Sequence, residues 1–175
     1  AHAQSASDAL DAIPYPPVAS VASAYARADV AHALDGFGFL VPKKEQRRIL
    51  GTIFSSTLFG NRAPDGMVLL TTFVGGMRQP ELAQLDEAAI GSLVQDELVS
   101  LLGVRAAPQR TWVNRWERAI PQYTLGHLGR ISAIDGTERA LPGLFLCANY
   151  RGGISVADCI KSSRAAADRI APYLH

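Results

Sequence analysis

The chain has 175 residues, of which 48% are hydrophobic and 19% are charged, and its formal net charge is +1. This length can bury the core of one domain or slightly more, and the composition is that of a globular rather than a disordered protein. The nearly neutral charge argues against nucleic-acid binding, which usually needs a clear basic excess. No apolar run approaches the roughly 20 residues that span a bilayer, and the N-terminus lacks the pattern of a signal peptide.

Most of the predicted strands lie in the first half of the chain. Residues 1–14 are predicted to be a lead-in, either frayed or forming a short helix, and the run Ile13–Pro17 is extended because proline restricts its own backbone and that of the preceding residue. Apolar, β-prone runs bounded by turn-forming residues then predict extended segments over residues 18–25, 36–42, 49–56 and 67–74. The second of these segments can equally be an ordered loop.

The second half of the chain contains two clear helix signals. Asp86 can cap a helix whose apolar residues recur at helical spacing until Gly103 ends it. The remaining predictions are a strand over 110–116, a long connection with at most one short helix over 121–143, an apolar strand over 144–148 and a last helix over 155–170. This order indicates an α+β fold with a mixed or antiparallel sheet and flanking helices.

The start of the last helix is the segment best suited to bind a ligand. Ser155 and Asp158 have the spacing of a capping box, and the donors that the cap leaves free can stabilise negative charge together with the helix dipole. Gly152 and Gly153 allow a ligand to approach the backbone closely. On these features alone, an ordinary corner between a strand and a helix is the favoured interpretation of the segment.

Other chemical signals are weak. The chain has neither a G-x-G-x-x-G motif nor a P-loop, and no serine lies in a G-x-S-x-G pattern. His127 stands in a distinctive segment, but a lone histidine is more often structural than catalytic, and no catalytic residue or metal ligand is predicted. Cys147 and Cys159 are predicted to be two buried, reduced thiols.

Three apolar residues come from three successive extended segments: Leu40, Ile53 and Phe73. If those strands are neighbours, the three side chains can line one side of a pocket for a large, flat ligand. Ordinary core packing is the alternative interpretation of the same pattern.

Five collinear segments resemble the protoporphyrinogen oxidase family. They are GFGFLVPKKE (36–45), LGTIFSS (50–56), RAPDG with LLTTFVGG (62–76), AIPQYTLGHL (119–128) and GLFLCANYRGGISVADCI (143–160). The likeness runs from about Tyr15 to the C-terminus and keeps the family's order and spacing. It therefore covers almost the whole chain.

The resemblance implies an FAD-dependent oxidase that converts protoporphyrinogen IX to protoporphyrin IX in haem synthesis. It implies that residues 15–120 belong to the substrate-binding domain and that residues 121–175 contact FAD. The residues that fall on flavin-contacting positions are Leu128, Asn149, Gly153, Ile154, Ser155 and Val156. Leu40, Ile53 and Phe73 fall on positions that hold the tetrapyrrole.

The sequence departs from the family pattern at two points, of which only the second limits the implied activity. Ala148 replaces the glycine common before Asn149, and no dinucleotide-binding motif is present. We therefore expect a C-terminal part that is inactive without an N-terminal FAD-binding half as its partner.

Three further points stay open on the sequence. A non-catalytic porphyrin-binding module is one alternative, and a flavin amine oxidase or desaturase with another substrate is a second. The oligomeric state is undetermined, with a homodimer as one option. The location implied is the cytoplasm, and peripheral attachment to a membrane is common in the family.

Overall fold

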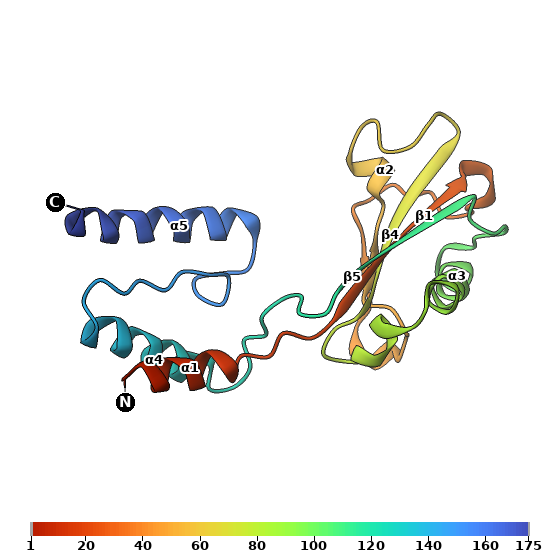
Figure 1. The fold of residues 1–175 in the computed structure, drawn as a ribbon. Helices are drawn as coiled ribbons and strands as arrows, with labels where there is room; N and C mark the ends of the chain where they lie inside the picture. The colour runs from red at the N-terminus through yellow and green to blue at the C-terminus, as the bar shows by residue number, and fades with distance from the viewer. Residues whose placement is uncertain (1, 175) are drawn as a thin grey trace. The chain divides into compact units, whose positions relative to one another are not determined.

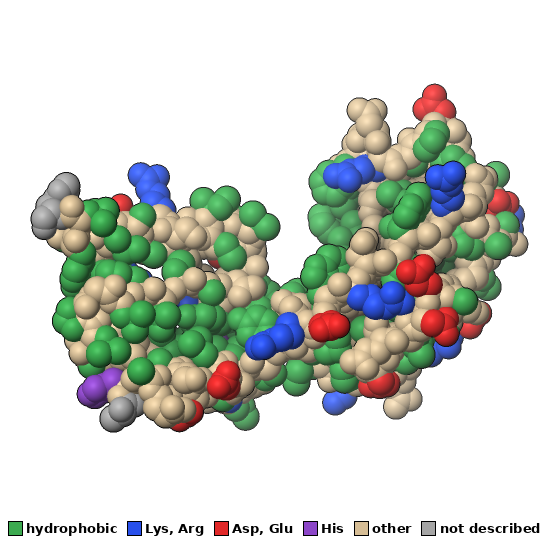
Figure 2. All heavy atoms as spheres, in the orientation of Figure 1, with side chains coloured by type: hydrophobic (Ala, Val, Ile, Leu, Met, Phe, Trp, Pro, Cys, Tyr) green, Lys and Arg blue, Asp and Glu red, His purple; other side chains and the backbone are tan. Residues whose placement is uncertain are grey.

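The computed structural model describes residues 2–174 and divides into two compact units (Figure 1). We call residues 16–119 the sheet unit, and residues 2–15 together with 120–174 the helical unit. The chain therefore starts in the helical unit, passes through the sheet unit and returns to the helical unit. Figure 2 shows that apolar side chains reach the surface of both units, with charged side chains scattered among them.

The sheet unit is built on five antiparallel strands in the order β2-β3-β4-β1-β5. The strands are β1 (Val18–Ala26), β2 (Gly38–Leu40), β3 (Gly51–Ile53), β4 (Met67–Gly75) and β5 (Arg110–Trp116). The sheet and its flanking helices confirm the predicted α+β fold. The strands expected over 18–25, 67–74 and 110–116 are also confirmed.

Helix α3 (Glu87–Leu102) forms the core of the sheet unit with one face of the sheet. Its Ile90, Val94 and Leu98 are fully buried, as are Val21, Leu70 and Val74 of the central strands. Burying one such side chain contributes roughly 1.5–3 kcal/mol, so this layer is the main source of stability in the unit.

The ends of α3 form as the sequence predicts. The carboxylate of Asp86 accepts a hydrogen bond from the Ala89 N–H at 2.8 Å, which satisfies one donor of the first turn. Gly103 ends the helix with a φ of 64°, a backbone conformation that glycine adopts without steric cost.

The chain also contains several short helices, and one of them, α2, takes the place of the end of a predicted strand. The short elements are η1 (Arg27–Asp29), η2 (Lys43–Glu45), α2 (Ser55–Leu58), η3 (Pro80–Gln84) and, in the helical unit, η4 (Ala171–Tyr173). The strand predicted over 49–56 spans only Gly51–Ile53. The Ser55 hydroxyl instead bonds Thr71 Oγ1 at 2.8 Å and the Ser56 hydroxyl accepts from the Leu69 N–H at 3.0 Å, so side chains replace strand pairing here.

The helical unit contains α1 (His2–Asp11), α4 (His127–Ala140) and α5 (Val156–Ile170). Helices α1 and α4 pack together around a small core of Ala9, Ile13, Ile134 and Tyr150. The lead-in therefore forms a helix, the second of its two predicted alternatives. The last helix is also where the sequence predicts it.

Three expectations about the second half of the chain are wrong. The connection over 121–143 contains the long helix α4 rather than one short helix at most. Residues 144–148 are not a strand: Leu146 N–H bonds the Glu138 carboxylate at 2.6 Å and Leu146 O accepts from Arg151 at 3.0 Å, so side chains take the place of a neighbouring strand. Cys147 is exposed and Cys159 is only partly buried, so neither is the buried thiol that was expected.

Candidate functional site

The sheet face opposite α3 is the first candidate surface. Leu40 on β2 pairs with Gly51 on β3, and Gly51 pairs with Phe73 on β4. Ile53 follows Gly51 by two residues, and side chains two residues apart on a strand point to the same face. The strands are thus neighbours, and the three predicted substrate residues share one face. Their contact with a ligand stays a prediction.

This face is open and largely apolar. The Leu40 side chain is 87% exposed, and Ile53 and Phe73 are partly exposed. Strand β5 adds Trp112 and Trp116, which lie on the same face because they pair with Ala22 and Val18, and both are about half exposed. An exposed apolar face of this kind suits a flat, apolar ligand.

The turn before α5 is the second candidate surface. Gly152 and Gly153 have φ values of 79° and 122°, and a Cβ on Gly153 would lie 2.5 Å from a carboxylate oxygen of Asp158. The Ser155 hydroxyl accepts from the Asp158 N–H at 3.0 Å and donates to the Asp158 carboxylate at 2.6 Å. The predicted capping pair therefore forms, and the Ser155 hydrogen bond lowers the pKa of Asp158.

Helix geometry leaves the N–H groups of Val156 and Ala157 without partners inside α5. Together with the positive end of the helix dipole, they favour a negatively charged group at this point. Two apolar side chains of this segment are exposed to solvent, Ile154 at 48% and Val156 at 79%. Leu128, at the start of α4, is 82% exposed.

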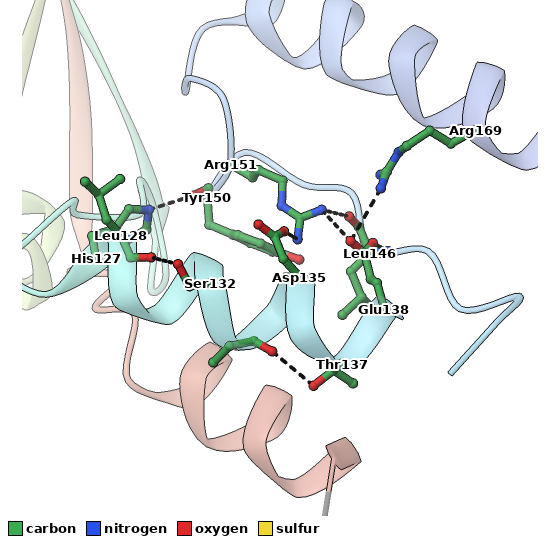
Figure 3. Close-up of polar contacts among 11 residues, drawn as sticks. His127, Leu128, Ser132, Asp135, Thr137, Glu138, Leu146, Tyr150, Arg151 and Arg169 are labelled. Carbon is green, nitrogen blue, oxygen red and sulfur yellow. Dashed lines mark hydrogen bonds and ion pairs between the residues drawn. The ribbon is translucent and has the colours of Figure 1, made fainter. Parts of the chain in front are cut away.

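Two aromatic side chains near the start of α4 hold the turn, and Figure 3 shows one of them, His127. His127 is buried, and its Nε2–H donates to the Tyr150 carbonyl at 2.8 Å, whereas Nδ1 has no hydrogen-bond partner among the described residues. Tyr123 stacks on the His127 ring with centroids 4.2 Å apart. These contacts support a structural interpretation of His127.

The Tyr123 hydroxyl also bridges the two ends of the glycine turn. It donates to the Asn149 carbonyl at 2.8 Å and accepts from the Gly153 N–H at 3.3 Å. Asn149 is partly buried, and its side-chain oxygen lies 3.4 Å from the Tyr15 hydroxyl. The structure thus brings together Asn149, Gly153, Ile154, Ser155 and Val156 in one segment, while Leu128 lies next to His127 on α4.

Arg151 binds two carboxylates of α4 from within the same turn (Figure 3). One guanidinium nitrogen lies 2.7 Å from Asp135, and the other lies 3.1 Å from Glu138. Arg169, near the end of α5, also reaches Glu138 at 3.4 Å. The Arg151 side chain is only 20% exposed, so these ion pairs are partly shielded from solvent.

The charge of Glu138 is stabilised by this arrangement. Burial by itself would raise the pKa of Glu138, but the hydrogen bond from the Leu146 N–H and the ion pairs with Arg151 and Arg169 outweigh it and lower the pKa. Glu138 is therefore ionised at neutral pH and serves as an acceptor for three parts of the helical unit.

Sequence reasoning did not find Tyr123, Arg151, Asp135 or Glu138. Tyr123 and Arg151 stand inside distinctive segments, but nothing in their spacing shows which partners they meet. Asp135 and Glu138 lie three residues apart and share a helix face, a signal that becomes visible only once α4 is recognised as a helix.

Residues 2–174 contain neither a metal-binding cluster nor a membrane-spanning helix. No group of three or more His, Cys, Asp or Glu side chains in this range can hold a metal ion. Within the same range, no helix combines the length and the apolar character needed to cross a membrane.

Comparison with protein families gives one match that covers nearly the whole chain. The model of the flavin containing amine oxidoreductase family matches residues 1–171. Among solved structures, a protein from Exiguobacterium sp. 255-15 named as a candidate protoporphyrinogen oxidase has a TM-score of 0.78 at 22% identity, over 97% of this chain and 39% of that one. At this identity the likeness shows the fold alone.

Curated relatives are more similar in sequence. The mitochondrial protoporphyrinogen oxidase of Nicotiana tabacum is 42% identical over 93% of this chain and 33% of its own length. Protoporphyrinogen oxidase 2 of Arabidopsis thaliana is 39% identical over 94% of this chain and 33% of its own length. The chain thus spans about a third of the length of these relatives.

Proposed function

The chain belongs to the flavin-containing amine oxidoreductase family, and on that premise we propose that it is the C-terminal part of an FAD-dependent oxidase that converts protoporphyrinogen IX to protoporphyrin IX. The observation that carries the proposal is the 42% identity with a protoporphyrinogen oxidase over 93% of the chain. In this proposal, residues 15–120 contribute the substrate-binding part and residues 121–175 contact FAD.

The turn before α5 has the chemistry that a flavin ring requires. Gly152 and Gly153 carry no side chains, so that a planar ring can approach the backbone of the turn. The N–H groups of Val156 and Ala157 supply hydrogen-bond donors, and exposed Ile154 and Val156 supply apolar contacts. These features fit the ring system of FAD, with Leu128 and Asn149 as further contacts.

The contribution of this segment to the reaction is electrostatic. FAD, when bound, accepts hydride from the substrate. The start of α5 holds positive partial charge in a fixed direction, which stabilises negative charge without reorganisation during the reaction. Ser155 keeps the helix start in place by capping it through Asp158.

The open face of the sheet unit is the proposed wall for the tetrapyrrole. Leu40, Ile53 and Phe73 give it aliphatic and aromatic side chains, and Gly51 between Leu40 and Phe73 adds no side chain that would interrupt the surface. Such a wall binds a macrocycle by burying apolar area and excludes water from one of its sides.

The test is oxidation of protoporphyrinogen IX by the complete protein that contains this chain. The purified protein is expected to show a flavin absorption band and to form fluorescent protoporphyrin IX with oxygen as electron acceptor. The isolated 175 residues are expected to show neither. Turnover of an amine or a carotenoid instead, or porphyrin binding without flavin, would replace the proposal with one of the alternative functions.

A matched pair of variants tests the proposed substrate wall. Leu40→Gln in the complete protein is expected to raise the KM for protoporphyrinogen about tenfold, since a polar group replaces apolar contact with the substrate. Val99→Gln makes a similar change at a side chain that is 46% exposed on α3, and its KM should stay unchanged. Equal KM values for the two variants would show that Leu40 does not contact the substrate.

A further inference from the structure

Arg151 immediately precedes the glycine turn, and its side chain makes contacts that the proposed function leaves unexplained. Its guanidinium lies 2.7 Å from the Asp135 carboxylate and 3.1 Å from that of Glu138, and it donates to the Leu146 carbonyl at 3.0 Å. The Arg151 side chain is 20% exposed and that of Glu138 is 10% exposed. The ion pair with Glu138 is therefore shielded from solvent, whereas the Asp135 side chain is 41% exposed.

Both carboxylates stand on α4, the helix that also begins with His127 (Figure 3). His127 holds the carbonyl of Tyr150, the residue immediately before Arg151. The segment that leads into Gly152 is therefore attached to one helix at two consecutive residues, once through its backbone and once through a side chain. A regular helix is a rigid support, so both attachments fix the same backbone relative to one frame.

The backbone beyond Arg151 has few other restraints before α5 begins. The Gly153 N–H donates to the Tyr123 hydroxyl at 3.3 Å, and the Arg151 carbonyl lies 3.5 Å from the Ser162 hydroxyl. Two consecutive glycines have a wide choice of backbone conformations, so the direction in which the chain leaves Arg151 decides where the turn lies.

We propose that Arg151, bound by Asp135 and Glu138, is a positioning residue that sets the glycine turn and the start of α5 for the flavin ring. The proposal rests on the function proposed above, because it assumes that FAD binds at this turn. Arg151 does not itself touch the ring in this proposal. It acts through the backbone of Gly152 and Gly153, and a small displacement of such a support can reduce rates or binding by up to about 100-fold.

Arg169 provides a matched control. It pairs with the same Glu138 at 3.4 Å, but it belongs to the last turn of α5 and its side chain is 46% exposed. Removing either arginine takes one cation away from Glu138, whereas only Arg151 is joined by its backbone to the glycine turn. A difference between the two variants therefore separates positioning of the turn from general stability of the helical unit.

The experiment uses the complete protein that contains this chain, with wild type, Arg151→Met, Arg169→Met and Asp135→Asn compared. The FAD dissociation constant, the visible flavin spectrum and the thermal unfolding midpoint are measured for each protein. Arg151→Met is expected to raise the dissociation constant about 10-fold to 100-fold and to shift the flavin spectrum. Arg169→Met should stay within about threefold of wild type, since exposed ion pairs contribute little.

Asp135→Asn removes one partner of Arg151 and keeps the size of the side chain. If Arg151→Met does not fold, Asp135→Asn decides the outcome, and it is expected to weaken FAD binding in the same direction. Two outcomes would overturn the positioning role but leave the proposed function standing. One is an equal loss of FAD affinity in Arg151→Met and Arg169→Met. The other is a lower unfolding midpoint of Arg151→Met with an unchanged flavin spectrum. A folded wild-type protein that binds no flavin would overturn the proposed function and this inference together.

Discussion

At the residue scale, Glu138 joins three parts of the helical unit. Its carboxylate accepts from the Leu146 N–H at 2.6 Å, from Arg151 at 3.1 Å and from Arg169 at 3.4 Å. Its pKa is lower in the folded protein than in the unfolded chain. The ionised carboxylate therefore contributes stability at pH values above its unfolded pKa, and this contribution is lost as the pH falls through the folded pKa.

Glu138→Gln is expected to lower the free energy of unfolding at pH 7 by roughly 1–3 kcal/mol, because it weakens hydrogen bonds to a charged group. The difference from wild type should shrink as the pH falls below the ordinary glutamate pKa of about 4.3, where the unfolded chain takes up the proton. It should vanish once the pH is below the lowered pKa of the folded carboxylate. Chemical denaturation between pH 3 and 7 measures both effects. Glu87→Gln is the control, since that side chain is 75% exposed and its partner Arg115 lies 3.9 Å away. Parallel pH profiles for wild type and Glu138→Gln would contradict the expectation.

Tyr123 gives a second test at this scale, directed at the glycine turn. Tyr123→Phe removes the hydroxyl that binds the Asn149 carbonyl and the Gly153 N–H, but it keeps the ring that stacks on His127. Faster hydrogen exchange is expected at the Gly153 amide, with a loss of stability of about 1 kcal/mol. Tyr173→Phe makes the same chemical change at a ring that packs edge-on against Phe145 and should leave Gly153 unaffected. Unchanged exchange at Gly153 in Tyr123→Phe would show that the hydroxyl does not hold the turn.

At the scale of elements, the sequence predicts what local signals encode. Helix α3 has a capping aspartate, a regular apolar repeat and a terminal glycine, and all three act as expected. Helix α4 lacks such signals: Gly129 and Gly136 lower its helix propensity, and its buried residues Ile134 and Thr137 pack in the unit formed with α1, far away in sequence. The apolar run over 144–148 predicts a strand, but the Leu146 backbone binds the side chains of Glu138 and Arg151 instead of a neighbouring strand.

In the candidate sites, too, the sequence predicts the features that depend on local signals and not those that depend on tertiary contacts. The common face of Leu40, Ile53 and Phe73 follows once the strands are neighbours, because alternation along a strand is a local property. The attachment of Arg151 to Asp135 and Glu138 depends on tertiary contacts across a loop and was not predictable from the sequence.

Two glycines test the turn before α5 against the first turn of α4. Gly153→Ala is expected to destabilise the helical unit by roughly 1–3 kcal/mol, because its φ is 122° and the new Cβ would lie 2.5 Å from Asp158, which caps α5. Gly129→Ala lies within α4 with open space around the new Cβ, and it should stabilise the unit by roughly 0.5–1 kcal/mol. Thermal unfolding of both variants checks the two signs. A stabilising Gly153→Ala would show that the turn does not need glycine.

The contact between α3 and the sheet is tested by neighbouring positions on one helix. Leu98→Ala empties a fully buried site and is expected to lower the free energy of unfolding by about 2–5 kcal/mol. Val99→Ala changes the next residue, which is 46% exposed, and should cost no more than about 0.5 kcal/mol. Urea denaturation followed by circular dichroism gives both values. Similar losses for the two variants would mean that α3 packs through a different face.

At the scale of the whole molecule, the two units differ in how their cores are assembled. The core of the sheet unit draws all of its residues from between Ala19 and Val104, so one continuous segment supplies it. The core of the helical unit combines Ala9 and Ile13 with Ile134 and Tyr150, from two segments that the sheet unit separates in sequence. Forming the second core requires closure of a long loop, which costs conformational entropy.

A fragment of residues 16–119 is therefore expected to fold alone, with a cooperative transition in urea, because no residue of its main core is missing. Residues 120–174 alone lack Ala9 and Ile13 and should show weak helicity by circular dichroism. Adding a peptide of residues 2–15 should raise that helicity, whereas the same peptide with Ile13→Asp should not, because a charge cannot replace a side chain that is 2% exposed. An unfolded 16–119 fragment would show that the sheet unit depends on the helical unit. Full helicity of residues 120–174 without the peptide would show that α1 is dispensable for the core of the helical unit.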